Sequence, residues 1–273
     1  MTGGGLRHEA AGQADAVLFA AASAAAAAFD DAFDGHSGEE LASIVGVGGD
    51  GTPTSRLDEI VDTAVLAAVD GYGVNVLSEE VGWVDRGSAL TLVVDPVDGT
   101  ANALAGVPIS TFSAALVLDG QPIVALTRWL ETGKDWLART GEPAGALWRT
   151  TGRRRLDGAA ISLLRPQAAS RAAWGEVAER AERVRVLSCS TFEAILVCTG
   201  ATDAFADLGA DVHRYVDLVA AQLYAALAGA TLCDAFGRPF EFDVDLTRRW
   251  SGVVAASEDL AAEIVETVSR RMS

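Results

Sequence analysis

Residues 92–108, LVVDPVDGTANALAGVP, constrain the fold more than any other part of the chain. The segment begins with apolar residues typical of a buried strand, and a turn fixed by a proline follows. Asp95 and Asp98 flank this turn, so their carboxylates and the Val97 carbonyl oxygen can converge on one point at the strand end. Hard oxygen ligands of this kind suit Mg²⁺ or Mn²⁺. The same letters also fit a simple Asp/Pro/Gly turn, so other parts of the chain must decide between the two interpretations.

More polar residues are expected at the same edge of the predicted sheet. Gly99 and Thr100 follow the turn directly; their N–H groups could hold a phosphate oxygen, and the threonine hydroxyl could touch a metal-bound water. The acidic pair Glu79 and Glu80 follows another apolar run, residues 74–77. Carboxylates at the ends of neighbouring strands are typical of a functional site.

The order of the expected elements divides the chain into an N-terminal α+β part, residues 1–152, and a C-terminal α/β part, residues 153–273. In the N-terminal part we expect strands around 74–77 and 90–94. The other expected elements are a long helix at 9–33, a glycine-rich loop at 45–53, a second helix at 55–69, a hairpin at 110–127 and two short strands at 135–138 and 146–149. In the C-terminal part strands at 159–164, 183–187, 204–206, 231–233 and 252–256 are expected to alternate with helices at 170–180, 191–199, 215–228 and 258–271.

The charge of the chain excludes one class of partner. It has 21 basic and 38 acidic residues, a formal net charge of −17, and Lys134 is its one lysine. There is no basic footprint for nucleic acid. Such a surface also repels anionic substrates unless bound cations reverse the local field, so chemistry on an anion is expected to need a metal.

Cysteine usage and apolar segments indicate the compartment. Cys189, Cys198 and Cys233 are widely spaced and form no CxxC pair, which fits a reducing, cytoplasmic environment. The alanine-rich run at 16–29 is shorter than the roughly 20 residues that span a bilayer, and no basic segment precedes it. We therefore expect no signal peptide and no membrane span.

Three segments together resemble the signatures of the inositol monophosphatase superfamily. They are SEEVG at 78–82, DPVDGTANALAGVP at 95–108 and VDLVAA at 216–221, in the family's order and spacing. The likeness extends over residues 47–256, and GDGTPTSRLDE at 49–59 is similar to a loop of the archaeal-type inositol monophosphatase/fructose-1,6-bisphosphatase branch. The resemblance implies a layered αβαβα sugar-phosphatase fold, Mg²⁺ dependence and, commonly, a homodimer.

The resemblance also implies a set of metal ligands. Glu79 is expected to bridge the ions, Asp95 and Asp98 to bind through their side chains, Val97 through its carbonyl and Asp217 from the C-terminal part. The chemistry asks for such a set independently, because two Mg²⁺ ions about 3.5 to 4 Å apart need about four carboxylates. Such ions neutralise charge on the phosphate oxygens and make a water nucleophilic. Two or three Mg²⁺ ions are expected, and Mn²⁺ could replace them.

The resemblance assigns the catalytic and substrate-binding roles as well. Thr100 is expected to orient the attacking water, paired with Asp50, which would also help to bind a further metal, and Glu79 completes the catalytic set. The residues expected to contact the substrate are Gly99, Thr100, Arg185, Ser188, Asp207 and Arg214. An ordinary surface ion pair is the alternative for Arg185 and Arg214, and solvation of its own loop is the alternative for Asp207. Two departures from the family pattern are Val216-Asp217 for its WD pair and Ser188-Cys189 for its GS or GT pair; the second puts the identity of the substrate in doubt.

Two other residues keep alternative interpretations. His213 lies four residues before Asp217 and fits either a ligand or a surface or capping residue. Cys189 fits either a nucleophile or a buried structural thiol, and no partner histidine is evident for the first role.

The expected function is Mg²⁺-dependent hydrolysis of a small phosphorylated polyol or sugar. Inositol 1-phosphate is the first candidate, and fructose 1,6-bisphosphate is the alternative. A non-catalytic family member that binds a protein partner is the alternative of another class, and the presence of all four carboxylates and Thr100 argues against it.

Overall fold

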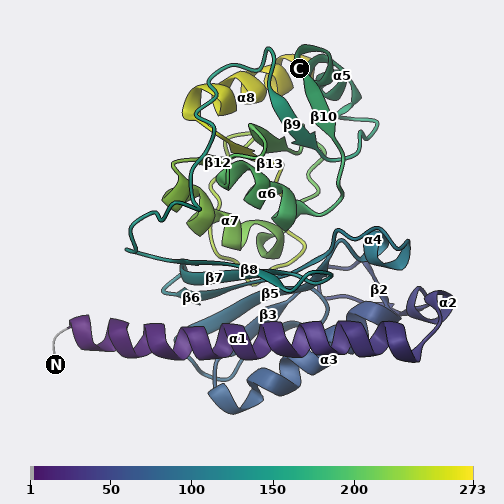
Figure 1. Cartoon of the computed structure of the whole chain (residues 1–273), viewed down its shortest axis with the longest axis vertical. Helices are drawn as coiled ribbons and strands as arrows, with labels where there is room; N and C mark the ends of the chain where they lie inside the picture. Colours follow the sequence, from purple (N-terminus) through teal and green to yellow (C-terminus); the bar gives the residue numbers. More distant parts are fainter. Residues whose placement is uncertain (1–2, 273) are drawn as a thin grey trace. The chain divides into compact units, whose positions relative to one another are not determined.

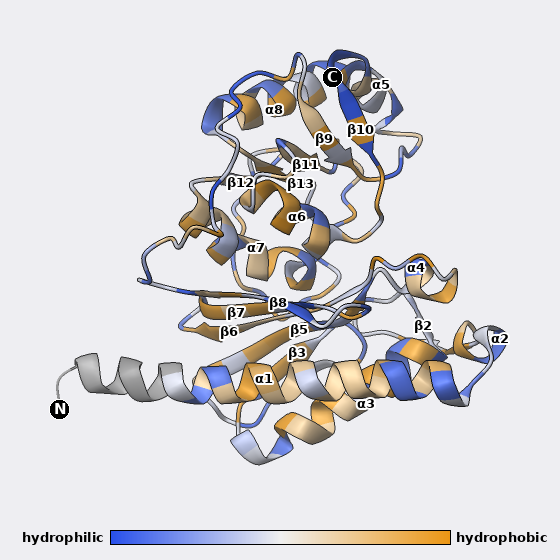
Figure 2. Ribbon diagram, viewed as in Figure 1, coloured by the Kyte–Doolittle hydropathy of each residue, from blue (hydrophilic) through white to orange (hydrophobic). Residues whose placement is uncertain are grey.

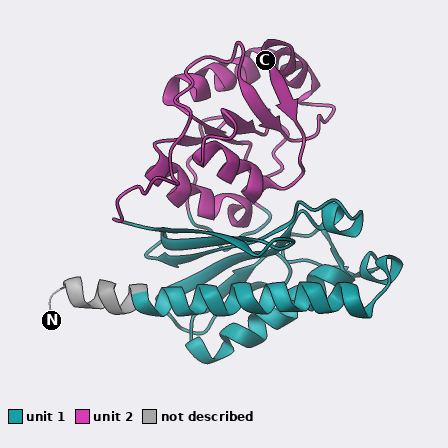
Figure 3. Ribbon diagram, viewed as in Figure 1, with its two compact units in different colours: residues 1–140, 242–247 teal, residues 141–241, 248–273 magenta. Residues whose placement is uncertain are grey.

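The computed structural model describes residues 3–272, with side chains from residue 12 onward. The chain forms two compact units, coloured separately in Figure 3. Unit 1 contains the residues up to 140 together with 242–247, and unit 2 contains residues 141–241 and the chain from 248 onward. Both units mix helices with strands, which confirms the predicted fold class.

Unit 1 is built on a six-stranded sheet with the order β4-β3-β5-β6-β7-β8. Figure 1 labels β3, β5, β6, β7 and β8 of this sheet. The strands β3 and β5 are parallel, and the other neighbours are antiparallel. Their bounds are β3 Asn75–Ser78, β4 Gly82–Val84, β5 Leu90–Asp98, β6 Thr111–Leu118, β7 Gln121–Trp129 and β8 Lys134–Arg139. The strand β5 is buried over nearly its whole length, as its continuous apolar run predicted.

The predicted hairpin of β6 and β7 is confirmed, and the residues of its turn explain why the sequence predicted it. Asp119 and Gly120 have φ values of 50° and 74°. A two-residue turn with left-handed backbone at both positions matches the twist of the strands, and Asp-Gly is a favoured pair for it.

The helices of unit 1 begin with α1, Gly3–Gly35, which packs with α3, Arg56–Val69, and contacts β5, β6 and β7. Buried residues of α1 recur every three or four positions: Ala14, Val17, Leu18, Ala21, Ala22, Ala25, Phe29 and Ala32. This stripe belongs to the core of unit 1. By length and composition alone the portion Gly12–Gly35 is apolar enough to cross a membrane, a test that core helices also pass. The alanine-rich run at 16–29, from which no span is expected, is only a part of this portion.

One hairpin and several short elements of unit 1 were missed, among them the strand β4 and the 3-10 helix Asp70–Tyr72. The glycine-rich segment 45–53, expected to be loop throughout, includes parts of β1, Ile44–Val47, and β2, Pro53–Ser55, which pair antiparallel. Most residues of β1 are exposed, so it forms through backbone pairing without the apolar alternation that sequence reading relies on. The single-turn helices α2, Gly38–Leu41, and α4, Thr100–Leu104, were also missed.

Unit 2 is built on a five-stranded sheet with the order β10-β9-β11-β13-β12. The strands β9, β10 and β11 are parallel, and β13 runs antiparallel to β11 and β12. Their bounds are β9 Ala160–Leu163, β10 Arg183–Arg185, β11 Ala204–Ala206, β12 Thr231–Asp234 and β13 Gly252–Ala255. The predicted alternation with helices is confirmed.

The helices of unit 2 are α5, Arg171–Arg180, α6, Ser190–Cys198, α7, Tyr215–Ala228, and α8, Glu258–Met272. α5 packs with α8, and α6 packs with α7, whose residues are largely apolar (Figure 2). The strand expected at 146–149 was wrong. Trp148 there stacks on Tyr224 with ring centroids 4.7 Å apart, so its apolar character serves packing without a strand partner.

Candidate metal centre

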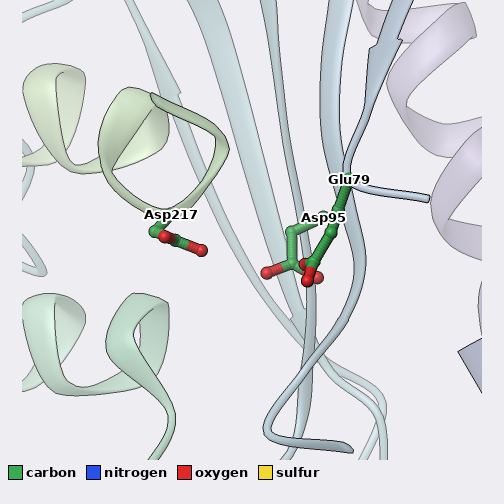
Figure 4. A group of neighbouring side chains, drawn as sticks. All are labelled: Glu79, Asp95 and Asp217. Carbon is green, nitrogen blue, oxygen red and sulfur yellow. The ribbon is translucent and has the colours of Figure 1, made fainter. Parts of the chain in front are cut away.

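Glu79 and Asp95 lie side by side at the carboxyl ends of two parallel strands. Ser78 of β3 is opposite Val94 of β5, and the Glu79 amide donates to the Val94 carbonyl oxygen at 3.3 Å. Their carboxylate oxygens lie within 4.8 Å of one another, and Figure 4 shows the two side chains pointing to the same place. Asp95 is 1% exposed. Two carboxylates held this close form a site that could bind a metal ion.

The turn after Asp95 is a β-bulge. Asp95 pairs with Ser113 and Asp98 with Thr111, so two residues of β5 oppose one residue of β6 between these pairs. The Val97 amide donates to Asp95 Oδ1 at 3.1 Å, which fixes the carboxylate against its own turn. Bulges re-aim side chains next to active sites, and the Pro96 in this one has no amide for a strand pair to lose.

The Thr100 hydroxyl is paired with Asp58, not with Asp50 as the sequence analysis expected. Its oxygen lies 2.7 Å from Asp58 Oδ1, to which it donates, and 2.8 Å from the Val97 carbonyl oxygen. Asp50 instead accepts the amide and hydroxyl of Thr52 through Oδ1, at 2.8 and 2.7 Å. Asp58 is thus a candidate functional residue that sequence reasoning missed.

A sequence signal for Asp58 existed. Ser55 and Asp58 form a capping box at the start of α3: the Asp58 amide donates to the Ser55 hydroxyl oxygen at 3.2 Å. In return, Asp58 Oδ2 accepts the Ser55 amide and hydroxyl at 3.2 and 2.7 Å. An S-x-x-D pattern before an apolar helical repeat predicts this arrangement. The cap fixes one oxygen of Asp58 and leaves the other directed at Thr100.

The loop that carries Asp50 is docked on the turn that carries Glu79. The Gly49 amide donates to the carbonyl oxygens of Glu79 and Glu80, at 2.9 and 2.8 Å. A Cβ at Gly49 would lie 2.5 Å from the Gly82 Cα, a distance that only glycine permits. Two backbones in contact therefore bring Asp50 to the same acidic group.

Burial and mutual repulsion raise the pKa of two further carboxyls here. Burial raises the pKa of Glu80 to about 7 against the hydrogen bond from the Thr54 hydroxyl, and the neighbouring Asp58 and Asp62 add to the rise. Burial raises the pKa of Asp62 to about 6, although the Ser78 hydroxyl donates to its Oδ1 at 2.5 Å. Unit 1 has 22 acidic and 6 basic residues, against 16 and 15 in unit 2. Its field draws cations to this cluster.

Asp217 belongs to the first turn of α7 in unit 2 and is 5% exposed. Its carboxylate accepts the Arg214 amide on Oδ2 at 2.6 Å, Nε on Oδ2 at 3.1 Å and Nη2 on Oδ1 at 2.8 Å. Burial acts to raise the pKa of Asp217, but the Arg214 charge and hydrogen bonds hold this pKa below its ordinary value. Asp217 is therefore a charged, buried and oriented carboxylate.

The residues expected to contact the substrate have different surroundings. Asp207 is 1% exposed and accepts the amides of Ala210 and Val212 at 2.8 and 2.9 Å, so it holds its own loop together. Ser188 is exposed and has a left-handed backbone with φ of 57°. Arg185 ends β10, and its buried Nη1 has no hydrogen-bond partner within the part of the chain that the structure describes.

Gly99, also expected at the substrate, has φ of 93° and precedes α4, so the chain turns sharply between Asp98 and Thr100. His213 is not on the surface: it is 1% exposed, and its Nδ1 accepts the Gly252 amide at 3.2 Å. Cys189 is fully buried, in agreement with the structural-thiol alternative. Burial raises the pKa of Cys198 to about 12.

Comparison with known proteins gives one consistent result. The model of the inositol monophosphatase family matches residues 12–273. A fructose-1,6-bisphosphatase/inositol-1-monophosphatase from Thermococcus kodakarensis is 30% identical over 231 residues, 82% of this chain and 86% of the relative. A fructose-1,6-bisphosphatase from Pyrococcus furiosus is 29% identical over 225 residues, 81% of this chain and 86% of the relative.

Solved structures agree. A crystal structure described as an inositol monophosphatase–fructose 1,6-bisphosphatase has a TM-score of 0.75 at 25% identity, and covers 84% of this chain and 92% of its own. A suppressor protein from Bartonella henselae has a TM-score of 0.76 at 21% identity over 93% of this chain and 97% of its own, which shows the fold alone. The family is generally metal-dependent and acts on phosphorylated sugars or polyols, in keeping with the acidic cluster. The chain belongs to the inositol monophosphatase family and is a phosphoric monoester hydrolase.

Proposed function

We propose that the chain hydrolyses the phosphate monoester of a small polyol or sugar with the help of bound Mg²⁺, for which Mn²⁺ can substitute. Inositol 1-phosphate and fructose 1,6-bisphosphate are equal candidates for the substrate, because relatives of both descriptions match. The observation that carries the proposal is the pair of adjacent carboxylates, Glu79 and Asp95.

The proposed ligand set consists of Glu79, Asp95, Asp98, the Val97 carbonyl and Asp217. Figure 4 draws three of these carboxylates, Glu79, Asp95 and Asp217. When bound, Mg²⁺ would neutralise charge on the phosphate oxygens and make a water acidic. The donors are all hard oxygens, which Mg²⁺ and Mn²⁺ prefer over softer ligands.

Asp50 remains a proposed ligand for a third ion. Its Oδ1 and Glu80 Oε2 both lie 3.3 Å from the point where a Gly48 Cβ would sit, so the two carboxylates are close neighbours. Burial is the main cause of the raised pKa of Glu80, and the negative charges of Asp58, Asp62 and Asp50 add to the rise.

The pair Thr100 and Asp58 is proposed to orient and deprotonate the attacking water. When the Thr100 hydroxyl donates its proton to Asp58 Oδ1 and not to the Val97 carbonyl oxygen, its own oxygen can accept a proton of the water. Asp58 can then receive a proton through the threonine oxygen, as a general base. Glu79 stays in the proposed catalytic set because it lies at the same strand end.

The remaining expected residues are proposed to bind the substrate. The amides of Gly99 and Thr100 follow Asp98 directly and are proposed to hold a phosphate oxygen. Arg185, Ser188 and Arg214 are proposed to read the rest of the molecule. The two amide contacts of Asp207 support a loop-holding role for that residue in place of substrate reading.

The test is phosphate release from inositol 1-phosphate and fructose 1,6-bisphosphate, with Mg²⁺, with EDTA, and after restoring Mg²⁺. We expect turnover that EDTA abolishes and Mg²⁺ restores. We expect the Asp95→Asn variant to have no turnover, although its circular-dichroism spectrum remains that of the folded chain. Glu142→Gln, on an exposed loop of unit 2, serves as a carboxylate control. Activity that survives both EDTA and Asp95→Asn would refute the metal assignment.

We also propose a homodimer in the cytoplasm, on the family resemblance and on the wide spacing of the three cysteines, which form no CxxC pair. Light scattering of the purified chain measures the oligomeric state. A folded, metal-binding chain that releases no phosphate from any sugar or polyol phosphate would instead favour the binding-module alternative.

A further inference from the structure

The side chains of Arg214 and Asp217 form an unusually complete pair inside unit 2. Arg214 is the N-cap residue of α7, and the carboxylate of Asp217 accepts three hydrogen bonds from it, one from its amide and two from its guanidinium. The two side chains are 15% and 6% exposed. Water therefore does little to compensate the charge on either group, and each compensates the other.

The lone pairs of the carboxylate show where a metal ion could reach it. Asp217 Oδ2 accepts two of the three hydrogen bonds, which occupies both of its lone pairs, while Oδ1 accepts one. A cation can bind Asp217 with all three contacts kept only through the second lone pair of Oδ1. It would then share this oxygen with Arg214 Nη2, which is 2.8 Å away. Two cations on one oxygen repel each other.

We propose that Arg214 stands in for the metal at Asp217 in the metal-free chain, so that a divalent cation binds Asp217 in competition with the guanidinium charge. This inference rests on the proposed function, which makes Asp217 a metal ligand. Arg214 keeps the buried carboxylate charged and the metal-free fold stable, and it lowers the affinity of Asp217 for the cation.

An alternative role for Arg214 makes the opposite prediction. If the planar guanidinium group of Arg214, with its fork of N–H donors, mattered only because it orients the Asp217 carboxylate, any loss of this fork would weaken metal binding. A charge that competes with the metal behaves differently, because its removal tightens binding. Lysine keeps the positive charge but not the fork, so it separates the two roles.

The experiment is a titration of Mn²⁺ into the metal-free full chain, followed by calorimetry and by the electron paramagnetic resonance signal of free Mn²⁺. The variants are Arg214→Met, Arg214→Lys and, as a matched control, Arg270→Met, which removes an exposed arginine that pairs with Glu176 on the surface. We expect the Mn²⁺ site that depends on Asp217 to bind at least tenfold tighter in Arg214→Met. Arg214→Lys and Arg270→Met are expected to bind as the wild type does.

Thermal unfolding gives a second readout that covers an unstable variant. Arg214→Met leaves a buried carboxylate without its cation, so the metal-free variant is expected to unfold at a lower temperature than the metal-free wild type. Saturating Mn²⁺ is expected to raise the unfolding temperature by more in this variant than in the wild type. Weaker Mn²⁺ binding in both Arg214 variants, or an Arg214→Met chain that Mn²⁺ fails to stabilise, would overturn the inference.

Failure of the proposed function gives a different pattern. If Asp217 is no metal ligand, Asp217→Asn binds as many Mn²⁺ ions as the wild type does, with the same affinity. If Asp217→Asn loses one Mn²⁺ site and Arg214→Met shows no tightening, the metal centre stands and only the role of Arg214 is wrong.

Discussion

Gly49 offers a direct test of how the Asp50 loop supports the metal centre. A methyl group at Gly49 would lie 2.5 Å from the Gly82 Cα, 2.6 Å from the Gly82 amide nitrogen and 3.3 Å from the Glu79 carbonyl oxygen. Ordinary contacts begin at 3.4 Å, so Gly49→Ala must separate the two backbones by about 0.9 Å. Both sides of the contact are main chain, so no side-chain rotation relieves it.

This displacement falls on the strand end that carries a proposed metal ligand. The Gly49 amide holds the carbonyl oxygens of Glu79 and Glu80, so Glu79 shifts with the loop. A misplacement of about 1 Å can lower the rate about 100-fold, which is about 2.7 kcal/mol of lost transition-state stabilisation. Overpacking of this kind also lowers the free energy of unfolding by about 1 to 3 kcal/mol.

The assay is kcat/KM for inositol 1-phosphate at saturating Mg²⁺, with thermal unfolding measured on the same samples. Gly46→Ala is the matched control: Gly46 lies in β1, three residues away, and its added Cβ would meet nothing within 4 Å. We expect a loss of about 100-fold in Gly49→Ala and less than twofold in Gly46→Ala. Wild-type kcat/KM in a folded Gly49→Ala would refute the coupling between the loop and Glu79, and equal losses in both variants would assign the effect to the hairpin backbone.

Asp98→Asn is expected to abolish turnover and leave the thermal unfolding temperature of the metal-free chain within a few degrees of the wild type, because an amide keeps the shape but not the charge of a metal ligand; turnover at the wild-type rate would exclude Asp98 as a ligand. Asp58→Asn is expected to lower kcat by about 100-fold or more, because Asp58 is the proposed proton acceptor, and to have a smaller effect on Mn²⁺ binding. Asp50→Asn is expected to weaken Mn²⁺ binding more than it lowers kcat. The reverse pattern in kinetics and titration would restore Asp50 as the partner of Thr100. Asp62 has a pKa of about 6 against an ordinary 3.8, so the folded metal-free chain binds its proton more tightly than the unfolded chain does, and stability falls as the pH rises through 6. Asp62→Asn is therefore expected to raise the free energy of unfolding in urea by up to about 3 kcal/mol at pH 8 and not at pH 4, and an equal gain at both values would show that the charge is not the cause.

The parts of the fold that the sequence predicted well are those whose signal is local. The apolar run of β5 ends at Asp95, where the sequence predicts a turn fixed by Pro96, and the structure has a β-bulge at this place. The Asp119-Gly120 turn is similar, since its backbone conformation is a property of those two residues. The carboxylates Glu79 and Asp95 were expected together because they follow neighbouring strands.

The parts that were missed depend on contacts between distant segments. Whether Asp50 or Asp58 reaches Thr100 is decided by where α3 starts relative to the end of β5. Asp58 and Thr100 are 42 residues apart in the sequence. Sequence spacing places Asp50 and Asp58 near the candidate metal centre but does not decide which of the two contacts Thr100. The β1 and β2 pair was missed for the same reason: the loop between them is fixed by Gly49 on Gly82, a tertiary contact.

The capping box of α3 ties the proposed catalytic pair, Asp58 and Thr100, to the first step of helix formation. Asp58 uses one carboxylate oxygen to close the helix start on Ser55 and the other to hold Thr100, so the two contacts are made or lost together when the side chain moves. Fraying of a single helical turn, the motion with the smallest free-energy change in most helices, would thus take away the proton acceptor. If Asp58 is the general base that we propose, a chain needs an intact first turn of α3 for chemistry, and protection of the Asp58 amide from hydrogen exchange measures how often that turn is intact.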